Sequence, residues 1–364
     1  MSLRRSAFIV STALAALAIA ITPAGAAVGP AAASARVVVR QPPAPTHHKR
    51  AETGRVVWTQ APDNTFAVGH LVSALPNGHD LRVITPDAPG VNDIDASFSP
   101  NGNRILYERD TPDTAVLHIV DADGTNDHVV NLGCSDTCVL DGSPTWLSSG
   151  RIAFTRLSGP FDGPNGSAAS AVLYTATPDG SHVRRLSESG IDGVYEDGYA
   201  HLSANRHYVV FVRNRVADAA GALFRMDLDG THVHQLTPFG TAFNPQIFDL
   251  STAKSGPTKN LVVFDTHVTG DDSLDLATVP ATCKTLVACT AKIRFLTHNA
   301  GGTTRNGNPT WSPDGRSIAF TERPSIDAED ANIWTMRYDT THRRQLSTSP
   351  KFDYRPNWGP AGCR

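Results

Sequence analysis

The chain has 364 residues, of which 40% are hydrophobic and 18% are charged, and its formal net charge is −3 at pH 7. A mildly acidic chain gives no electrostatic reason to expect a nucleic-acid partner or an anionic membrane surface. The length fits one large β domain.

Residues 1–35 have the organisation of a secretion signal peptide. Arg4 and Arg5 precede an apolar stretch over residues 7–21, and small-residue cleavage sites end at positions 26 and 35. The apolar stretch is short for a membrane span, and no stop-transfer charges follow it. An uncleaved anchor is the alternative. We expect export to the periplasm, the cell envelope or the medium, with no membrane insertion of the mature chain.

Residues 36–51 form a proline-rich segment that predicts an extended, flexible linker. It contains the pair His47 and His48, which offers a weak metal site as the alternative to a solvated linker. Residues 52–364 follow as the predicted globular domain.

The domain consists of short strand-sized segments joined by turns, and its clearest unit covers residues 308–347. There a Pro-Asp-Gly turn at residues 313–315 joins two strands, because proline presets one backbone dihedral and glycine accepts a positive φ. Two further strand-sized segments follow at residues 333–336 and 343–347. One small antiparallel sheet of this kind cannot bury its faces alone, so repeats are expected.

Similar units occur at residues 98–130, 144–187, 201–237 and 244–297. A large apolar residue ends each first strand, with successive spacings of 48, 56, 46, 63 and 47 residues, at Phe98, Trp146, Leu202, Phe248, Trp311 and Trp358. Such spacings are typical of β-propeller blades, and helical 3.6-residue periodicity is missing.

The two ends of the domain complete one more blade. Residues 55–59 begin a copy that lacks its first strand, whereas residues 354–360 form a first strand with nothing after it. The sequence therefore predicts an all-β, six-bladed β-propeller of four-stranded antiparallel blades, closed by the C-terminal strand joining the N-terminal blade.

The recurring Pro-x-Trp-Ser-Pro-Asp-Gly-Arg-x-Ile-Ala-Phe pattern, best seen at residues 309–320, resembles the TolB-type propeller repeat. The Asp-Gly turns that follow it recur at Asp123, Asp179 and Asp229. The resemblance covers roughly residues 52–360. TolB carries an α/β domain before its propeller, and residues 36–54 are too few for that domain, so we expect a propeller alone.

The cysteines predict two short-range disulfides, Cys134–Cys138 and Cys283–Cys289, because each pair is local and lies in a loop. Metal ligation is the alternative, but no second Cys or His cluster has zinc-site spacing. Cys363 remains as a free thiol or an intermolecular link.

The position five residues before each first-strand apolar residue carries an acid or an amide in five copies: Asp93, Asp141, Asp197, Asn306 and Asp353. The fifth blade breaks the pattern at Phe243. If these side chains ring one mouth of the channel, they would bind Ca²⁺ or an amino or guanidinium group of a partner. The alternative is that each caps its own turn.

Two insertions, at residues 157–171 and 266–273, lie on the same end of the ring as the predicted acidic residues. Rigid scaffolds present binding contacts on loops, so this end is the expected binding surface. A tolerated surface insertion is the alternative.

The sequence contains no Gly-x-Ser-x-Gly elbow, which excludes a serine hydrolase of that kind. His118, His201 or His207 could lie beside a carboxylate in the channel and serve a metal-dependent lyase or hydrolase. The preferred interpretation is a monomeric, non-enzymatic binding scaffold without a cofactor, for a protein or glycan partner.

Overall fold

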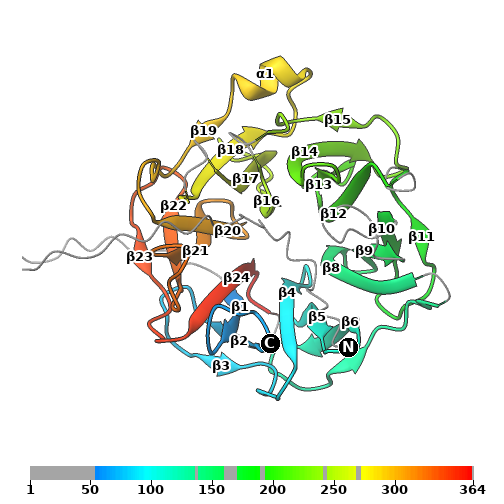
Figure 1. Cartoon of the computed structure of the whole chain (residues 1–364), viewed down its shortest axis with the longest axis vertical. Helices are drawn as coiled ribbons and strands as arrows, with labels where there is room; N and C mark the ends of the chain where they lie inside the picture. Colours follow the sequence, from blue (N-terminus) through cyan, green and yellow to red (C-terminus); the bar gives the residue numbers. More distant parts are fainter. Residues whose placement is uncertain are drawn as a thin grey trace, which may run out of the picture. The chain divides into compact units, whose positions relative to one another are not determined.

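The computed structural model describes residues 54–135, 138–159, 170–188, 193–240, 244–267 and 272–362. The predicted signal peptide and linker, Phe243 and Cys363 lie outside these residues. Within them, six groups of four antiparallel strands follow one another around a central axis (Figure 1). The fold is the predicted six-bladed β-propeller.

Each of the first three blades runs from an inner to an outer strand, and the inner strand of blade 1 comes from the C-terminal end of the described chain. Blade 1 contains β24 (Phe352–Gly359), β1 (Arg55–Ala61), β2 (His70–Ala74) and β3 (Arg82–Val83). Blade 2 contains β4 (Asn92–Phe98), β5 (Arg104–Asp110), β6 (Ala115–Asp121) and β7 (His128–Val129). Blade 3 contains β8 (Cys138–Ser148), β9 (Arg151–Ser158), β10 (Ser170–Ala176) and β11 (Arg184–Arg185).

The last three blades repeat this order from the inside outward. Blade 4 contains β12 (Tyr195–Leu202), β13 (Tyr208–Arg215), β14 (Ala220–Asp227) and β15 (His234–Gln235). Blade 5 contains β16 (Phe248–Leu250), β17 (Leu261–Thr266), β18 (Asp275–Pro280) and β19 (Arg294–Phe295). Blade 6 contains β20 (Arg305–Trp311), β21 (Ser317–Arg323), β22 (Asn332–Arg337) and β23 (Arg344–Gln345).

The hydrophobic core is divided among the interfaces between successive blades. Each of six buried clusters combines side chains of two neighbouring blades. The cluster that joins the ends of the chain contains Trp58 of β1, Ile333 of β22 and Trp358 of β24. Each blade therefore depends on its two neighbours to remove its apolar faces from water.

Short parallel bridges tie neighbouring blades at one end. The start of a third strand pairs with the first strand of the next blade, and these pairs are Gly69 with Asn92, Ala171 with Glu196, Leu274 with Arg305 and Ala331 with Phe352. The last pair links blade 6 to the closing strand. The ring is thus sealed by main-chain pairing as well as by side-chain packing.

One alignment made from the sequence is wrong. The repeat spacing places Phe248 at the end of the first strand of blade 5, but in the structure Leu250 pairs with Val262 as Trp311 pairs with Ile318. The equivalent residue is therefore Leu250, and the spacings around it become 48 (250 − 202) and 61 (311 − 250) residues.

Both predicted disulfides are confirmed. The Cα–Cα distances are 5.2 Å for Cys134–Cys138 and 5.3 Å for Cys283–Cys289. In the second pair, Cys289 lies within a five-residue helix, α1 (Leu286–Thr290), and Cys283 precedes it. Other blades have a tight turn at this place between their third and fourth strands. No helix within the described residues is long and apolar enough to cross a membrane.

Removal of Phe352–Arg364 is expected to abolish cooperative unfolding, because it removes β24 and exposes the packed face of β1. Thermal unfolding followed by circular dichroism measures the effect. A chain lacking only residues 363 and 364 keeps β24 and serves as the control. Equal melting temperatures for the two truncations would contradict ring closure as the source of stability.

Candidate functional site: the channel and its mouth

The five residues predicted to ring the channel mouth are buried inside their blades. Their exposed fractions lie between 0% and 4%, for Asp93, Asp141, Asp197, Asn306 and Asp353. Each lies directly opposite a second-strand residue, and these partners are Arg109, Arg156, Arg213, Glu322 and Gln60. Opposite residues of an antiparallel pair project from the same face, so each predicted site residue lies beside a second-strand side chain of its own blade.

In blades 2, 3 and 4 the partner is an arginine that binds both carboxylate oxygens. Arg109 donates to Asp93 at 2.7 and 2.9 Å from Nε and Nη2. The corresponding distances from Nε and Nη2 are both 2.7 Å in the pair Arg156–Asp141, and 2.7 and 3.0 Å in the pair Arg213–Asp197. Bidentate pairs are among the stronger charge-assisted contacts, and loss of one partner leaves a buried charge uncompensated.

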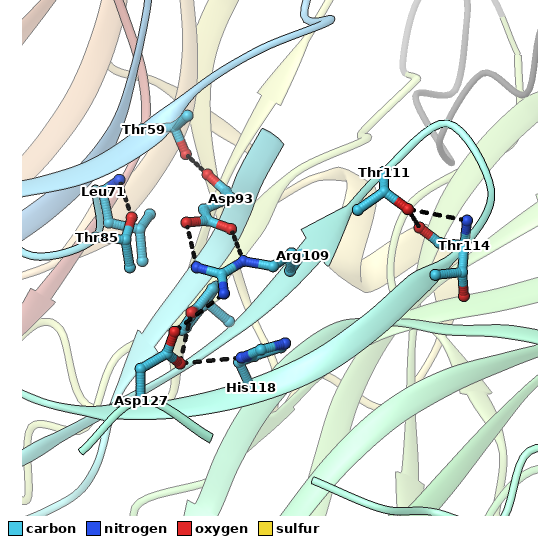
Figure 2. A network of polar contacts seen from close by, with 10 residues as sticks. Thr59, Leu71, Thr85, Asp93, Arg109, Thr111, Thr114, His118 and Asp127 are labelled. Carbon is cyan, nitrogen blue, oxygen red and sulfur yellow. Dashed lines mark hydrogen bonds and ion pairs between the residues drawn. The ribbon is translucent and has the colours of Figure 1, made fainter. Parts of the chain in front are cut away.

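The pair in blade 2 continues outward into a larger network (Figure 2). Arg109 also donates from Nη1 to Asp127 at 3.0 Å, and Asp127 accepts from the Tyr107 hydroxyl at 2.8 Å. His118 Nδ1 lies 3.0 Å from the same carboxylate. Burial opposes ionisation of Asp127, but the hydrogen bonds of His118 and Tyr107 outweigh it and lower its pKa to about 2. His118 thus belongs to a network inside the blade.

Blades 1 and 6 lack this arginine. Gln60 Nε2 donates to Asp353 Oδ1 at 2.9 Å, and burial raises the pKa of Asp353. Neither the amide nitrogen nor the oxygen of Asn306 has a hydrogen-bond partner among the described residues. Its neighbour Glu322 pairs with Arg343 instead.

These contacts do not suit a shared Ca²⁺ site. In three blades a guanidinium group holds the carboxylate oxygens that the cation would need, and it carries positive charge itself. The turn-capping alternative also differs from the contacts seen, because turns are capped by the Asp-Gly aspartates. Asp123, for example, accepts the Thr125 N–H at 3.0 Å. The cation hypothesis for the five residues stays a prediction.

The channel itself is lined by residues farther along the first strands. It encloses a cavity of about 60 Å³, which has room for a few water molecules. Five lining residues have φ between 48° and 54°: Asp95, Ser143, Tyr199, Asn308 and Arg355. Each lies at an irregular register in its blade, so a repeated bulge turns these side chains toward the channel. The equivalent residue of blade 5 is Ile247, whose φ is not positive.

Arg355 is the buried cation of this cavity, and its charge is matched by Asp95. The two form an ion pair, and the Tyr199 hydroxyl donates to the other Asp95 oxygen at 3.3 Å. Burial disfavours the charge of Arg355, but Asp95 outweighs it and the pKa of Arg355 rises above its ordinary value. The guanidinium is therefore committed to a neighbour inside the protein.

His201 is the candidate histidine that faces the channel beside a carboxylate. Its Nδ1 lies 3.1 Å from Asp249 Oδ1, while Asp249 Oδ2 accepts from the Thr310 hydroxyl at 3.0 Å and the Trp311 N–H at 2.8 Å. His207 is exposed on the surface. Asp249 thus joins blade 5 to blade 6 and also orients the imidazole of His201.

The role of Asp249 is repeated at other interfaces. Residues at the same position accept a main-chain N–H of the next blade, in the pairs Asn357 with Phe98 (2.9 Å), Ser97 with Trp146 (3.2 Å) and Thr310 with Trp358 (3.4 Å). The inner polar ring therefore satisfies buried main-chain donors.

Two buried carboxyl groups lie beside the Arg355 pair. Burial raises the pKa of Glu108 well above its usual range and that of Asp110 to about 6. Neither oxygen of Asp110 has a hydrogen-bond partner within the described residues, so burial favours the neutral, protonated form of this carboxyl group. Glu108 also accepts the Ser143 N–H at 2.7 Å and so links blade 2 to blade 3.

One group of three possible metal ligands lies together among the described residues: Cys134, Cys138 and Asp141. The two cysteines form a disulfide and Asp141 is bound by Arg156, so none of them offers a free ligand atom.

The channel cavity is lined by other repeat positions than the one that carries the five predicted residues. The lining residues stand three, two and one before the first-strand apolar residue. A usable signal was present at the last of these positions, where a polar residue interrupts each apolar first strand: Ser97, Thr145, His201, Asp249, Thr310 and Asn357.

Comparison with solved structures supports the fold. The chain is similar to TolB from Acinetobacter baumannii (TM-score 0.61, 16% identity, covering 84% of this chain and 67% of that one). It is also similar to a putative TolB from Agrobacterium tumefaciens (0.56, 13%, 85% and 99%) and to a chain of a nidogen–laminin complex (0.56, 10%, 85% and 99%). No protein-family model and no curated protein sequence matches. At these identities the similarity shows a TolB-like propeller fold.

Arg109→Met is expected to lower the free energy of unfolding by about 3–5 kcal/mol, because Asp93 would remain buried without its partner. The double variant Asp93→Asn, Arg109→Met should recover part of this loss in urea unfolding at pH 7. Arg215→Met is the control, since its partner Asp218 is 50% exposed and the expected loss is about 1 kcal/mol or less. Equal losses for the two arginines would contradict the buried pairing.

Asp110→Asn is expected to flatten the dependence of stability on pH. An acid whose pKa is raised in the folded state, here from 3.8 to about 6, stabilises the fold at low pH and loses that contribution as pH rises through 6. The free energy of unfolding of the wild type should therefore rise between pH 7 and pH 5 by an amount on the order of 1 kcal/mol, followed by urea unfolding at each pH. The exposed control Asp330→Asn should keep the wild-type slope. An unchanged slope in Asp110→Asn would contradict a raised pKa of Asp110 in the folded state.

Proposed function

We propose that this protein is an exported, non-enzymatic propeller that binds a protein or glycan through its loop face and channel mouth. The loop face is the end of the ring with the second-to-third strand loops and the connections between blades. The observation that carries the proposal is that the channel charges are paired with one another, Arg355 with Asp95 and His201 with Asp249, around a cavity of about 60 Å³. Small-molecule sites usually enclose about 300–1,000 Å³.

The similar structures support contact with another protein. One of them comes from a complex between two proteins, nidogen and laminin. The fold is also shared with TolB structures. A rigid ring with variable loops suits such a role, because the scaffold positions the loops before binding and reduces the ordering cost.

The charge of the loop face favours a basic group on the partner. Exposed acidic residues lie on it in several blades: Asp87, Asp113, Asp327, Glu329 and Asp330. The last three stand close together in the loop between β21 and β22. Complementary charge would speed association and select the partner.

The predicted signal peptide and the two disulfides support an oxidising compartment outside the cytoplasm. We propose that the mature protein acts there as a monomer without an inserted membrane segment. No step of its action depends on a cofactor.

An enzymatic role is the second candidate, and the His201–Asp249 pair favours it. A lyase or hydrolase acting in the channel would use the imidazole as a base and would need a metal ion beside it. His201→Gln should abolish such turnover, measured as bond cleavage in envelope polysaccharides with added divalent metal. The binding proposal expects no turnover in either protein.

Binding through the loop face is tested by capture from the envelope fraction of the source cells. The triple variant Asp327→Asn, Glu329→Gln, Asp330→Asn should recover the partner of the wild-type protein at least about tenfold less well, because three exposed charges contribute together. The variant Asp179→Asn, Asp229→Asn, Asp339→Asn changes the net charge equally on the opposite end, where asparagine can still accept the turn hydrogen bonds. Equal recovery by the loop-face variant and the wild type would overturn the proposal.

A further inference from the structure

Lysine is concentrated in two loops at one end of blade 5. The sequence has six lysines, and four of them lie in residues 251–260 and 281–293: Lys254, Lys259, Lys284 and Lys292. These 23 residues (10 + 13) contain no aspartate or glutamate. Arginine supplies most positive charge elsewhere in the chain, so the grouping of flexible lysine ammonium groups is a local feature.

The two loops lie together on the end of the ring opposite the loop face. Residues 251–260 join β16 to β17 and residues 281–293 join β18 to β19, so both follow strands that run in the same direction. Ala281 N–H donates to the Asn260 carbonyl at 2.9 Å, which fixes the loops side by side. All four lysines are exposed, and none forms an ion pair with another described residue.

The second loop is held rigid and projects from the ring. Helix α1 lies outside β18 and β19 (Figure 1), with Thr285 as its N-cap. The Cys283–Cys289 disulfide closes its base, and both cysteines belong to the core cluster between blades 4 and 5. Val287 on this helix is 81% exposed, more than any other large hydrophobic side chain of the described residues. A pre-ordered protrusion loses little conformational freedom on binding.

We propose that this lysine-rich protrusion, residues 251–260 and 281–293, is a docking surface for an acidic segment of another protein. Carboxylates of the partner meet the four lysines, and an apolar side chain of the partner covers Val287. An apolar contact within a charged rim is the usual arrangement of protein–protein interfaces. A polyanionic glycan would use the lysines but would leave Val287 without a contact. The surface is separate from the loop face, so it does not rest on the function proposed above.

The test uses the mature protein and two labelled synthetic peptides in fluorescence anisotropy at low ionic strength. In the first peptide, glutamates flank a central Leu-Phe pair, and in the second the pair is replaced by two glycines. The variant Lys254→Gln, Lys259→Gln, Lys284→Gln, Lys292→Gln should weaken binding of the first peptide at least about tenfold, and added salt should weaken wild-type binding. Lys351→Gln, which removes the remaining lysine of the described residues, should leave affinity unchanged.

The variant Val287→Ser distinguishes an acidic protein partner, which contacts Val287, from other polyanions, which do not. It should weaken the Leu-Phe peptide about threefold or more and leave the glycine peptide unaffected, while melting temperatures confirm that every variant is folded. The proposal is overturned if the first peptide does not bind, or if the lysine variant binds it as well as the wild type does. It is also overturned if polygalacturonate or phosphatidylglycerol vesicles bind more tightly than the peptide and Val287→Ser has no effect.

Discussion

The structure depends on the burial of apolar sheet faces between successive blades. A four-stranded blade exposes two such faces, and neither can be covered from within the blade. Six interfaces cover all of these faces only if the last blade packs against the first. The pairing of β24 with β1 and the cluster around Trp58 and Trp358 make this contact. The ring is therefore one cooperative unit, and its stability and its channel have the same origin.

The polar interior follows from the same arrangement. First strands line the axis. Buried main-chain donors and charged groups there must find hydrogen-bond partners within the protein, because bulk water does not reach them. The repeat meets this need with Asp–Arg pairs inside blades 2, 3 and 4, and with an inner ring in which residues such as Asp249 accept a donor of the next blade. Most charged groups around the channel are therefore paired with a neighbour inside the protein.

Charged side chains lie at both ends of the propeller. Exposed carboxylates such as Asp327 and Asp330 gather on the loop face, while four lysines gather at the opposite end of blade 5. A chain with a net charge of only −3 can thus present strong local fields of both signs.

The sequence by itself determined the fold class, the six-blade count, the closure of the ring and both disulfides, because these follow from local turn chemistry, repeat length and short cysteine spacing. It did not determine which residues share a site. The alignment of blade 5 was wrong by two residues, since Phe248 and Leu250 lie on the same face and a shift of two preserves strand alternation. Only the tertiary structure decided that Asp93 meets Arg109 and that Arg355 reaches Asp95, because both contacts depend on strand register and on bulges, which apolar periodicity does not encode.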